Sequence, residues 1–415
     1  MAVKAILKIS LAVVLGWCAL SEVGVAFVSR TFGFRMDGDW ILILGASSPS
    51  EMSEFFRLYS TEVTLAVVIL LTLLTLMAIG TFLLKGKWFW LFVALVLGYV
   101  GWNCRTVSRA KGWTPVFMAY DTLCRTSQYL ELGKAGKWAG DVLPEYANRG
   151  SQSLPNVVFV IGESMTTDRM SLYGYGKPTT PFLDGMREQM TVMGPLRATS
   201  ASTVPALRMM LTRATEKAPD RAIETLAVAF RRRGYRPALI SAQPRWGRRC
   251  GVGQQIFAAC ENRIYLADGE IGSAMYDEAI VPYLQREMAV KDDRPFAIFL
   301  HLRGSHMDPK KAVPPDFKTQ EGLDAYDRSL VYTDHVLEGI FRSLPPQTIL
   351  VYTSDHGESP DSPTWRDGSS PSLWRVPFMA WPKTGGDGKL ERQDQIFDWL
   401  LGRLDAAVGH PKGGT

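Results

Sequence analysis

A long uncharged apolar run, Val63 to Leu84, constrains the fold of this chain more than any other feature of its sequence. A helix that crosses a bilayer needs about 20 mainly apolar residues, and this run meets that requirement without a charged side chain. Two further stretches are candidate spans: Ile9 to Val28, with few polar interruptions, and the shorter Trp88 to Trp102. The pattern therefore predicts a membrane domain at residues 1–104 with about three transmembrane helices, followed by interfacial or linker helices at residues 105–153.

Basic residues give an orientation for these spans. Lys4 and Lys8 precede the first span, and Lys85 and Lys87 lie between the last two. Because short loops rich in lysine and arginine stay in the cytoplasm, we expect the rest of the chain to emerge on the outer side. The basic residues that follow the third span favour the opposite side. A cleaved signal peptide is the alternative for the first span, and it would leave the rest of the chain outside as well.

The remaining residues, 154–415, have the pattern of a water-soluble α/β domain. Short apolar runs typical of buried strands alternate with segments of helical periodicity. The predicted strands are 156–161, 236–240, 295–302, 348–353 and 376–381, and the predicted helices are 221–233, 275–288, 323–344 and 393–404. Such alternation predicts a mostly parallel sheet flanked by helices, in which ligands bind at the carboxyl ends of the strands.

Polar residues follow three of the predicted strands. Glu163 follows the first strand, His301 and His306 lie at the end of another, and Asp355 and His356 follow a third. Because the carboxyl ends of parallel strands meet at one edge of the sheet, we expect these side chains to converge. Carboxylate and imidazole ligands suit a divalent metal, zinc above all. The sequence therefore predicts a zinc site at this edge, with His301 more typical of a packed side chain than of a ligand.

Charge and cysteine content argue against nucleic acid binding and against a cysteine-ligated zinc cluster. The chain has 46 basic and 41 acidic residues, a net charge of +5, which is too weak a bias to indicate nucleic acid binding. Its five cysteines form no CxxC pair, so a cysteine-ligated zinc cluster is not expected. Cys250 and Cys260 are ten residues apart and would form a disulfide in an oxidising compartment, or remain two thiols.

Six segments of the C-terminal part resemble one enzyme group. They are NVVFVIGESMTTDRMSLYGYGKPTTP (156–181), STVPALRMML (202–211), GYRPALISAQ (234–243), HLRGSH (301–306), YDRSLVYTDHVL (326–337) and VYTSDHGES (351–359). The chain resembles the alkaline-phosphatase-like sulfatase superfamily and, within it, the phosphoethanolamine transferases that modify lipid A, lipopolysaccharide core or periplasmic glucans. The formylglycine sulfatase signature CxPxR is missing. The resemblance implies an alkaline-phosphatase-like α/β fold behind an N-terminal transmembrane segment.

The resemblance also implies a ligand set and a nucleophile. Carried over, the zinc ligands are Glu163, Asp355, His356 and the hydroxyl of the nucleophile. That nucleophile is commonly a threonine five residues before a proline, and here the position holds Ser200. One zinc ion is expected, and a second is an open alternative. A hydroxyl on zinc loses its proton more readily and becomes a competent nucleophile.

Other positions in the same segments carry predicted roles. Thr199, Ser202 and Thr203 are alternative nucleophiles because they crowd the same loop as Ser200. His306 matches a histidine that stabilises the transferred phosphoryl group or protonates a leaving group. Thr199, together with Ser164 and Asp367, is a candidate for substrate binding. Asp367 stands where related enzymes have a histidine, so it would contact a cation or an ammonium headgroup rather than act as an imidazole does.

The resemblance implies a membrane-bound phosphoethanolamine transferase of the bacterial inner membrane, with its catalytic domain in the periplasm. Phosphatidylethanolamine would be the donor, and lipid A, lipopolysaccharide core or a glucan the acceptor, through a covalent phospho-enzyme. Two alternatives remain open. The first is a phosphoglycerol transferase of the same superfamily. The second is a zinc-free pseudoenzyme that serves as a scaffold, which the departures at Ser200 and Asp367 motivate.

Overall fold

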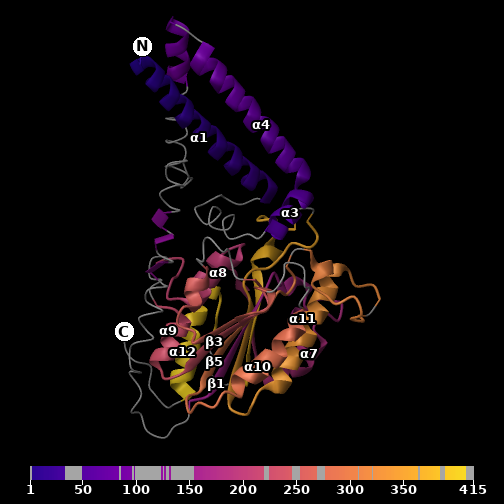
Figure 1. The fold of residues 1–415 in the computed structure, drawn as a ribbon. Helices are drawn as coiled ribbons and strands as arrows, with labels where there is room; N and C mark the ends of the chain where they lie inside the picture. Colours follow the sequence, from indigo (N-terminus) through magenta and orange to yellow (C-terminus); the bar gives the residue numbers. More distant parts are fainter. Residues whose placement is uncertain are drawn as a thin grey trace. The chain divides into compact units, whose positions relative to one another are not determined.

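The structure is a computed structural model, and its described residues form two compact units (Figure 1). It describes residues 2–32, 49–83, 86–95 and 98, single positions between 123 and 131, and residues 154–407 except 219–223, 245–252, 269–275, 307, 320, 363–364 and 384–387. The N-terminal unit contains residues 1–126 and 367–369, and the C-terminal unit contains residues 127–366 and 370–415.

Two long apolar helices and a short polar one are described in the N-terminal unit. They are α1 (Ala2–Phe32), α3 (Pro49–Leu58) and α4 (Ser60–Ala78), and α4 continues into a π-helical turn, Ile79–Leu83. Two stretches, Lys8–Phe32 and Ser60–Leu83, are long and apolar enough to cross a membrane. None of the α4 side chains that the structure describes is buried. A helix that is apolar on all sides and is not covered by protein is suited to a lipid environment.

The two longer spans that the sequence predicts coincide with these helices. The third predicted span, 88–102, is described as a helix only over Gly86–Leu95, which is too short to cross a bilayer alone. Its remainder, and most of the predicted linker helices at 105–153, lie outside the described residues. The number of spans and the domain boundaries therefore stay predictions. Cys250 also lies outside the described residues, so its disulfide with the buried Cys260 stays a prediction too.

A seven-stranded sheet forms the centre of the C-terminal unit. Its order is β2-β7-β6-β1-β5-β3-β4, with bounds β1 Asn156–Gly162, β2 Thr191–Arg197, β3 Arg236–Ser241, β4 Asn262–Tyr265, β5 Phe296–His301, β6 Thr348–Ser354 and β7 Arg375–Trp381. The pairs among β6, β1, β5, β3 and β4 are all parallel, whereas β7 is antiparallel to both β6 and β2. The predicted mostly parallel sheet is therefore confirmed, with an antiparallel edge.

Helices lie on both sides of the sheet, with α7, α10 and α11 on one side and α8, α9 and α12 on the other (Figure 1). Their bounds are α7 Pro181–Met186, α8 Thr203–Leu211, α9 Leu226–Arg232, α10 Ile280–Met288, α11 Ala325–Ser343 and α12 Ile396–Ala407. The four predicted helices correspond to α9, α10, α11 and α12. Helix α9 is shorter than predicted because Thr225 caps it, accepting the Val228 N–H.

Two strands were not predicted from the sequence, and both lie at edges of the sheet. Strand β2 contains the dipeptide Gly194-Pro195, and its register with β7 shifts between Met193 and Leu196. Proline lacks the N–H that a central strand donates, so it argues against a strand unless the strand is an edge or carries a bulge. Strand β4 has only four residues, none of them buried. Neither strand has the apolar run that identified the central ones.

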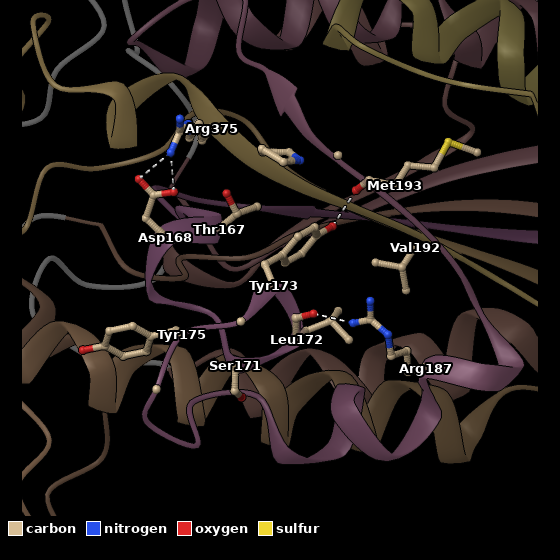
Figure 2. A pocket seen from close by; sticks show the side chains of 14 residues that line it. Thr167, Asp168, Ser171, Leu172, Tyr173, Tyr175, Arg187, Val192, Met193 and Arg375 are labelled. Carbon is tan, nitrogen blue, oxygen red and sulfur yellow. Dashed lines mark hydrogen bonds and ion pairs between the residues drawn. The ribbon is translucent and has the colours of Figure 1, made fainter.

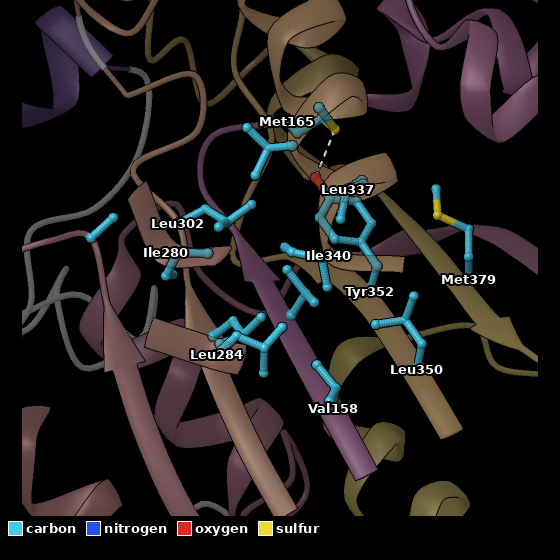
Figure 3. Close-up of a cluster of buried hydrophobic side chains, with 14 of the residues drawn as sticks. Val158, Met165, Ile280, Leu284, Leu302, Leu337, Ile340, Leu350, Tyr352 and Met379 are labelled. Atoms are coloured by element: carbon cyan, nitrogen blue, oxygen red, sulfur yellow. Dashed lines mark hydrogen bonds between the residues drawn. The ribbon is translucent and has the colours of Figure 1, made fainter. Parts of the chain in front are cut away.

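Apolar side chains from the sheet and from helices α10 and α11 form a buried core (Figure 3). Val158 of β1 packs with Leu284 of α10 and Ile340 of α11 in this cluster. The Tyr352 hydroxyl, at the end of the cluster nearest the carboxyl ends of the strands, donates to Met165 Sδ at 2.9 Å. The core therefore holds β1 and β6 in register up to the residues that follow them, Glu163 and Asp355, where the candidate site begins.

Candidate metal centre

Three buried side chains converge where β1 and β6 end. Glu163 follows β1, Asp355 and His356 follow β6, and each is fully buried. One potential ligand atom from each lies within 4.8 Å of the others. The parallel pairing of β1 and β6 explains this proximity, since it places Gly162 beside Ser354. Three of the four ligands that the sequence predicted are thus brought together.

The His356 ring is neutral and directs a lone pair into this cluster. Burial, and next the Arg366 guanidinium, lower the pKa of His356 to about 3. Its Nδ1 lies 2.7 Å from the Gly357 carbonyl oxygen, which accepts only, so the proton is assigned to Nδ1. Nε2 lies 3.3 Å from Asp355 Oδ2 and 3.5 Å from Glu163 Oε1. With a neutral ring these approaches are not ion pairs, and the three atoms are all electron-pair donors.

The Asp355 carboxylate has one satisfied oxygen and one oxygen without a donor. Oδ1 accepts the backbone N–H groups of Ser164 at 3.1 Å and His356 at 2.7 Å. Oδ2 has no hydrogen-bond donor among the described residues. Burial raises the pKa of Asp355, and the hydrogen bonds from the Ser164 and His356 N–H groups oppose that shift. A cation at Oδ2 would satisfy this atom, so these residues fit a metal ion, and their nitrogen and oxygen donors suit zinc.

Ser164 joins the two ligand carboxylates through a constrained backbone. Its N–H donates to Asp355, and its Oγ donates to Glu163 Oε1 at 2.9 Å. The residue adopts a φ of 57°, a left-handed conformation that is uncommon for a side chain other than glycine. The Tyr326 hydroxyl fixes that conformation by donating to the Ser164 carbonyl at 2.6 Å and accepting the Thr166 N–H at 3.0 Å. The described contacts of Ser164 position the ligands, and its predicted substrate contact stays a prediction.

The remaining oxygen of Glu163 accepts two further hydrogen bonds. Thr203 Oγ1 donates to Oε2 at 3.1 Å, and Gln243 Nε2 donates to the same atom at 2.9 Å. Gln243 also donates to the Leu302 carbonyl at 3.0 Å, which ties Glu163 to the loop after β5. Gln243 was not predicted as a site residue. It ends one of the segments that resemble the transferases, and that position was the one signal available in the sequence.

The predicted nucleophile loop lies beside the cluster, held there by Gln393. The buried Gln393 side chain accepts the Thr199 N–H at 2.8 Å and donates to the Ser354 and Asp355 carbonyl oxygens, each at 2.7 Å. The loop then enters helix α8 at Thr203. Ser200 Oγ accepts the Ser202 N–H at 3.2 Å. Within the described residues, no hydrogen bond joins Ser200 to the three ligands, whereas Thr203 contacts Glu163 directly.

His301, the last residue of β5, and His306, in the loop that follows, differ in their surroundings. His301 is buried, and burial lowers its pKa to about 4, so it is a neutral packed residue in this structure. His306 is partly exposed, and it lies near the cluster because the N–H of the preceding Ser305 donates to the Glu163 carbonyl at 2.9 Å. Asp367 groups with the N-terminal unit, and its carboxylate accepts the Ser369 N–H and hydroxyl. Its predicted contact with a headgroup stays a prediction.

Arg366 is a second residue that the sequence did not predict. One of its terminal nitrogens lies 3.3 Å from His356 Nε2, and its Nε lies 3.9 Å from Glu358 Oε2. Glu358 is buried, and burial raises its pKa to about 8. The sequence carried no signal for this contact. Arg366 lies in a loop without periodicity, seven residues after the last segment that resembles the transferases. A cationic group therefore lies directly beside the three ligands.

An open cleft of about 910 Å³ lies beside the loop that follows Glu163 (Figure 2). Tyr173 and Arg187 line it from one side, and β2 residues such as Met193 line it from the other. The Asp168 carboxylate pairs with Arg375 at 3.2 Å and accepts the Ser372 hydroxyl at 2.7 Å. The Ser372 backbone packs tightly against Gly357, next to the ligand His356. The contacts of Ser372 with Asp168 and with Gly357 therefore link the wall of the cleft to the segment that follows His356.

The sequence of the C-terminal unit matches a known family model. The model described as Sulfatase matches residues 155–398. The phosphoethanolamine transferase EptC of Escherichia coli O18:K1:H7 is 29% identical over 277 residues, which cover 58% of this chain and 48% of that protein. The Kdo(2)-lipid A phosphoethanolamine 7''-transferase of Escherichia coli K12 is 27% identical, over 54% of this chain and 44% of that protein. The chain spans about half the length of the curated relatives it matches.

Solved structures give the same comparison at the level of the fold. The zinc complex of the C-terminal periplasmic domain of EcEptC from Escherichia coli superposes with a TM-score of 0.54 and 25% identity, covering 62% of this chain and 84% of that one. The integral membrane phosphoethanolamine transferase EptA from Neisseria meningitidis gives a TM-score of 0.59 at 17% identity, covering 97% of this chain and 84% of that one. At 17% identity, the similarity to EptA from Neisseria meningitidis shows a shared fold only.

Proposed function

The chain belongs to the sulfatase family, and on that premise we propose that it is a membrane-bound phosphoethanolamine transferase. The observation that carries the proposal is the convergence of Glu163, Asp355 and His356, with a hydroxyl-bearing loop held against them by Gln393. Several curated relatives, EptC and the Kdo(2)-lipid A phosphoethanolamine 7''-transferase among them, are named for this activity, and the periplasmic domain of EcEptC is known as a zinc complex.

Glu163, Asp355 and His356 would hold a zinc ion through Glu163 carboxylate oxygen, Asp355 Oδ2 and His356 Nε2. Bound there, zinc would lower the pKa of a nearby hydroxyl and stabilise negative charge that develops on the phosphoryl oxygens. The protein orients the ligands in advance. Ser164 links the two carboxylates, and the Gly357 carbonyl fixes the His356 ring. Such outer contacts typically change metal affinity by about 10- to 100-fold.

We assign the nucleophile to Ser200 rather than to Thr203. The backbone N–H of Ser202 donates to Ser200 Oγ, and a donor at this oxygen favours its ionised form. Thr203 instead donates its own proton to Glu163, so its hydroxyl orients a ligand. Position supports this assignment as well, since Ser200 lies five residues before Pro205, as the nucleophile does in the resembling enzymes.

The reaction would proceed in two balanced steps. Ser200 Oγ, ionised after its proton has passed to water, forms a bond to phosphorus as the phosphorus–oxygen bond to diacylglycerol breaks. His306 gives its proton to the departing diacylglycerol oxygen. In the second step an acceptor oxygen forms a bond to phosphorus as the bond to Ser200 Oγ breaks, and Ser200 leaves as the same alkoxide. An acceptor hydroxyl returns its proton to His306, and with a phosphate acceptor His306 regains its proton from water. Positioning and charge stabilisation supply the rate in both steps.

The N-terminal helices would keep the enzyme at the donor lipid. Lys8–Phe32 and Ser60–Leu83 are long and apolar enough to span a bilayer. A periplasm-facing catalytic unit of a bacterial inner membrane protein would meet phosphatidylethanolamine and its lipid or glycan acceptor on the same membrane surface. We propose phosphatidylethanolamine as donor and lipid A, lipopolysaccharide core or a glucan as acceptor.

The test compares donors in vesicles with the detergent-purified full chain. Phosphatidylethanolamine labelled in its headgroup should release diacylglycerol and leave the label on the protein, whereas phosphatidylglycerol should not. Thr203→Val should retain label on the protein at a reduced rate, and Ser200→Ala should retain none. Labelling from phosphatidylglycerol alone would replace this proposal with a phosphoglycerol transferase. No labelling from either donor, together with no bound zinc, would favour a pseudoenzyme.

A further inference from the structure

Arg366 makes a contact that a metal at the three ligands must break. Its terminal nitrogen lies 3.3 Å from His356 Nε2 and can only donate. The Nε2 lone pair, which accepts from Arg366 in this structure, is the same lone pair that would bind the metal. A nitrogen has one such lone pair in a neutral imidazole, so the guanidinium and a metal ion compete for it.

A buried carboxyl group lies beside the guanidinium and is a candidate partner for it once that contact breaks. Glu358, two residues after His356, is buried, and its Oε2 lies 3.9 Å from Arg366 Nε. The Arg366 side chain itself is about one fifth exposed, so one edge faces the buried cluster and another is accessible. A guanidinium has five donors, and the terminal pair can bind two oxygens of one phosphate.

We propose that Arg366 binds the phosphoryl group of the substrate at the three ligands, after leaving His356 Nε2. This inference rests on the proposed function, because it assigns the group that recognises the phosphoryl oxygens in the same site. Arg366 then has two alternating partners, the imidazole lone pair without metal and a phosphate oxygen with metal. A guanidinium beside zinc is repelled by the ion, and an anion between them removes that repulsion.

The proposal predicts opposite effects of one substitution on two ligands. In Arg366→Ala, zinc should bind at least as tightly as in the wild type, because a competing donor and a nearby positive charge are gone. The zinc-loaded variant should bind inorganic phosphate and phosphoethanolamine about 10- to 100-fold more weakly, since a charged hydrogen-bond donor has been lost. Arg366→Lys should lie between the two, because lysine keeps the charge but not the paired donors.

The measurement uses the full chain in detergent, with zinc affinity from chelator competition and phosphate affinity from calorimetry on the zinc-loaded protein. Arg294→Ala is the matched control. It removes an arginine that pairs with Asp292 and Glu261, just before the amino end of β5, and it should change neither affinity. Melting temperatures identify variants that fail to fold, and Arg366→Gln replaces Arg366→Ala if the latter does.

Two outcomes would overturn the proposal. Unchanged phosphate affinity in the folded Arg366 variants would exclude contact with the phosphoryl group, and an equal loss of zinc and phosphate would assign Arg366 a structural role. Neither measurement requires transfer from a lipid donor. If the phosphate result holds and transfer fails, the proposed function is wrong and the anion site remains. If transfer holds and the phosphate result fails, only this inference is wrong.

Discussion

Helix α4 and strand β1 are both strongly apolar, yet the side chains of α4 are exposed in this structure and those of β1 are buried. In α4, Leu65, Val68 and Leu71 are each more than half exposed, and no described side chain is buried. In β1, all five residues from Val157 to Ile161 are fully buried. Burying an apolar side chain stabilises a fold by about 1.5–3 kcal/mol. Strand β1 gains this from protein, whereas α4 lacks it unless lipid covers the helix.

The C-terminal unit also differs from α4 in that it buries charged side chains. The C-terminal unit buries not only apolar side chains but also Glu163, Asp355 and His356. Burying unpaired carboxylates is costly, so their convergence without a described donor at Asp355 Oδ2 indicates a cation site rather than a structural network. On the proposed function, the apolar unit would hold the enzyme at the membrane, and the buried charged residues would carry out the reaction.

Removing one ligand should give the largest effect. Asp355→Asn keeps the shape and the hydrogen bonds at Oδ1 but removes the charge at Oδ2. We expect zinc affinity to fall by more than the roughly 100-fold that an outer contact contributes, and labelling by phosphatidylethanolamine to stop. Elemental analysis and the labelling assay measure the two effects.

Asp398→Asn is the control, since Asp398 is largely exposed and pairs with Arg213 at 3.1 Å, away from the three ligands. It should bind zinc as the wild type does. Retention of full zinc affinity in Asp355→Asn would contradict the assignment of the buried cluster to a metal, and would reduce the contrast between the two units to apolar burial alone.

Deleting the N-terminal unit tests the comparison directly. A chain of residues 127–415 should remain soluble and bind zinc with unchanged affinity, because the core and the three ligands lie within this unit. Transfer from vesicles should fall by about 100-fold or more, since the lipid donor is no longer held at a high effective concentration. Aggregation of this fragment without detergent would contradict the independence of the C-terminal unit. Transfer at the full rate would contradict the role of the N-terminal unit in holding the enzyme at its lipid donor.

Replacing Gln393 should slow the labelling reaction without changing the zinc content. Gln393→Ala removes the side chain that holds Thr199 to the end of β6, and leaves buried carbonyl oxygens without a donor. We expect labelling to slow by about 10-fold, a stability loss of about 1–3 kcal/mol, and unchanged zinc content. Loss of zinc in a folded variant would instead assign Gln393 to the metal site.

Two glycines offer the smallest and most closely matched test. A Cβ at Gly357 would lie 2.1 Å from the Ser372 carbonyl oxygen, whereas a Cβ at Gly402 of α12 would meet no atom within 4 Å. Gly357→Ala should therefore destabilise the protein by about 1–3 kcal/mol, and Gly402→Ala should stabilise it by about 0.5–1 kcal/mol. Thermal unfolding of the C-terminal unit measures both. Equal effects would mean that the segment after His356 is not tightly packed.

The central strands and the ligand cluster could be predicted because their signals are local. An apolar run such as 348–353 identifies a buried strand, and parallel pairing then brings the residues after each strand together. Strands β2 and β4 lacked such runs, and the Gly194-Pro195 pair argued against β2. A strand at the edge of a sheet is defined by its neighbour more than by its own residues.

Contacts around the ligands were not predictable in the same way. Gln243, Arg366 and Gln393 come from three loops or helix starts, and each reaches the cluster from a long distance along the sequence or from an aperiodic loop. The left-handed backbone of Ser164 was equally hidden, because serine does not favour it and tertiary hydrogen bonds hold it there. Motif matching identified the ligands, but their orientation depends on three-dimensional packing.

The most direct test of the account measures zinc and the covalent intermediate on the same molecules. The full chain, purified in detergent and incubated with phosphatidylethanolamine without an acceptor, is analysed for metal content and for intact mass. We predict about one zinc per chain and a mass increase of one phosphoethanolamine group that is absent in Ser200→Ala, whose zinc content falls at most modestly. A zinc-free protein, or an adduct of the same mass in Ser200→Ala, would contradict the account.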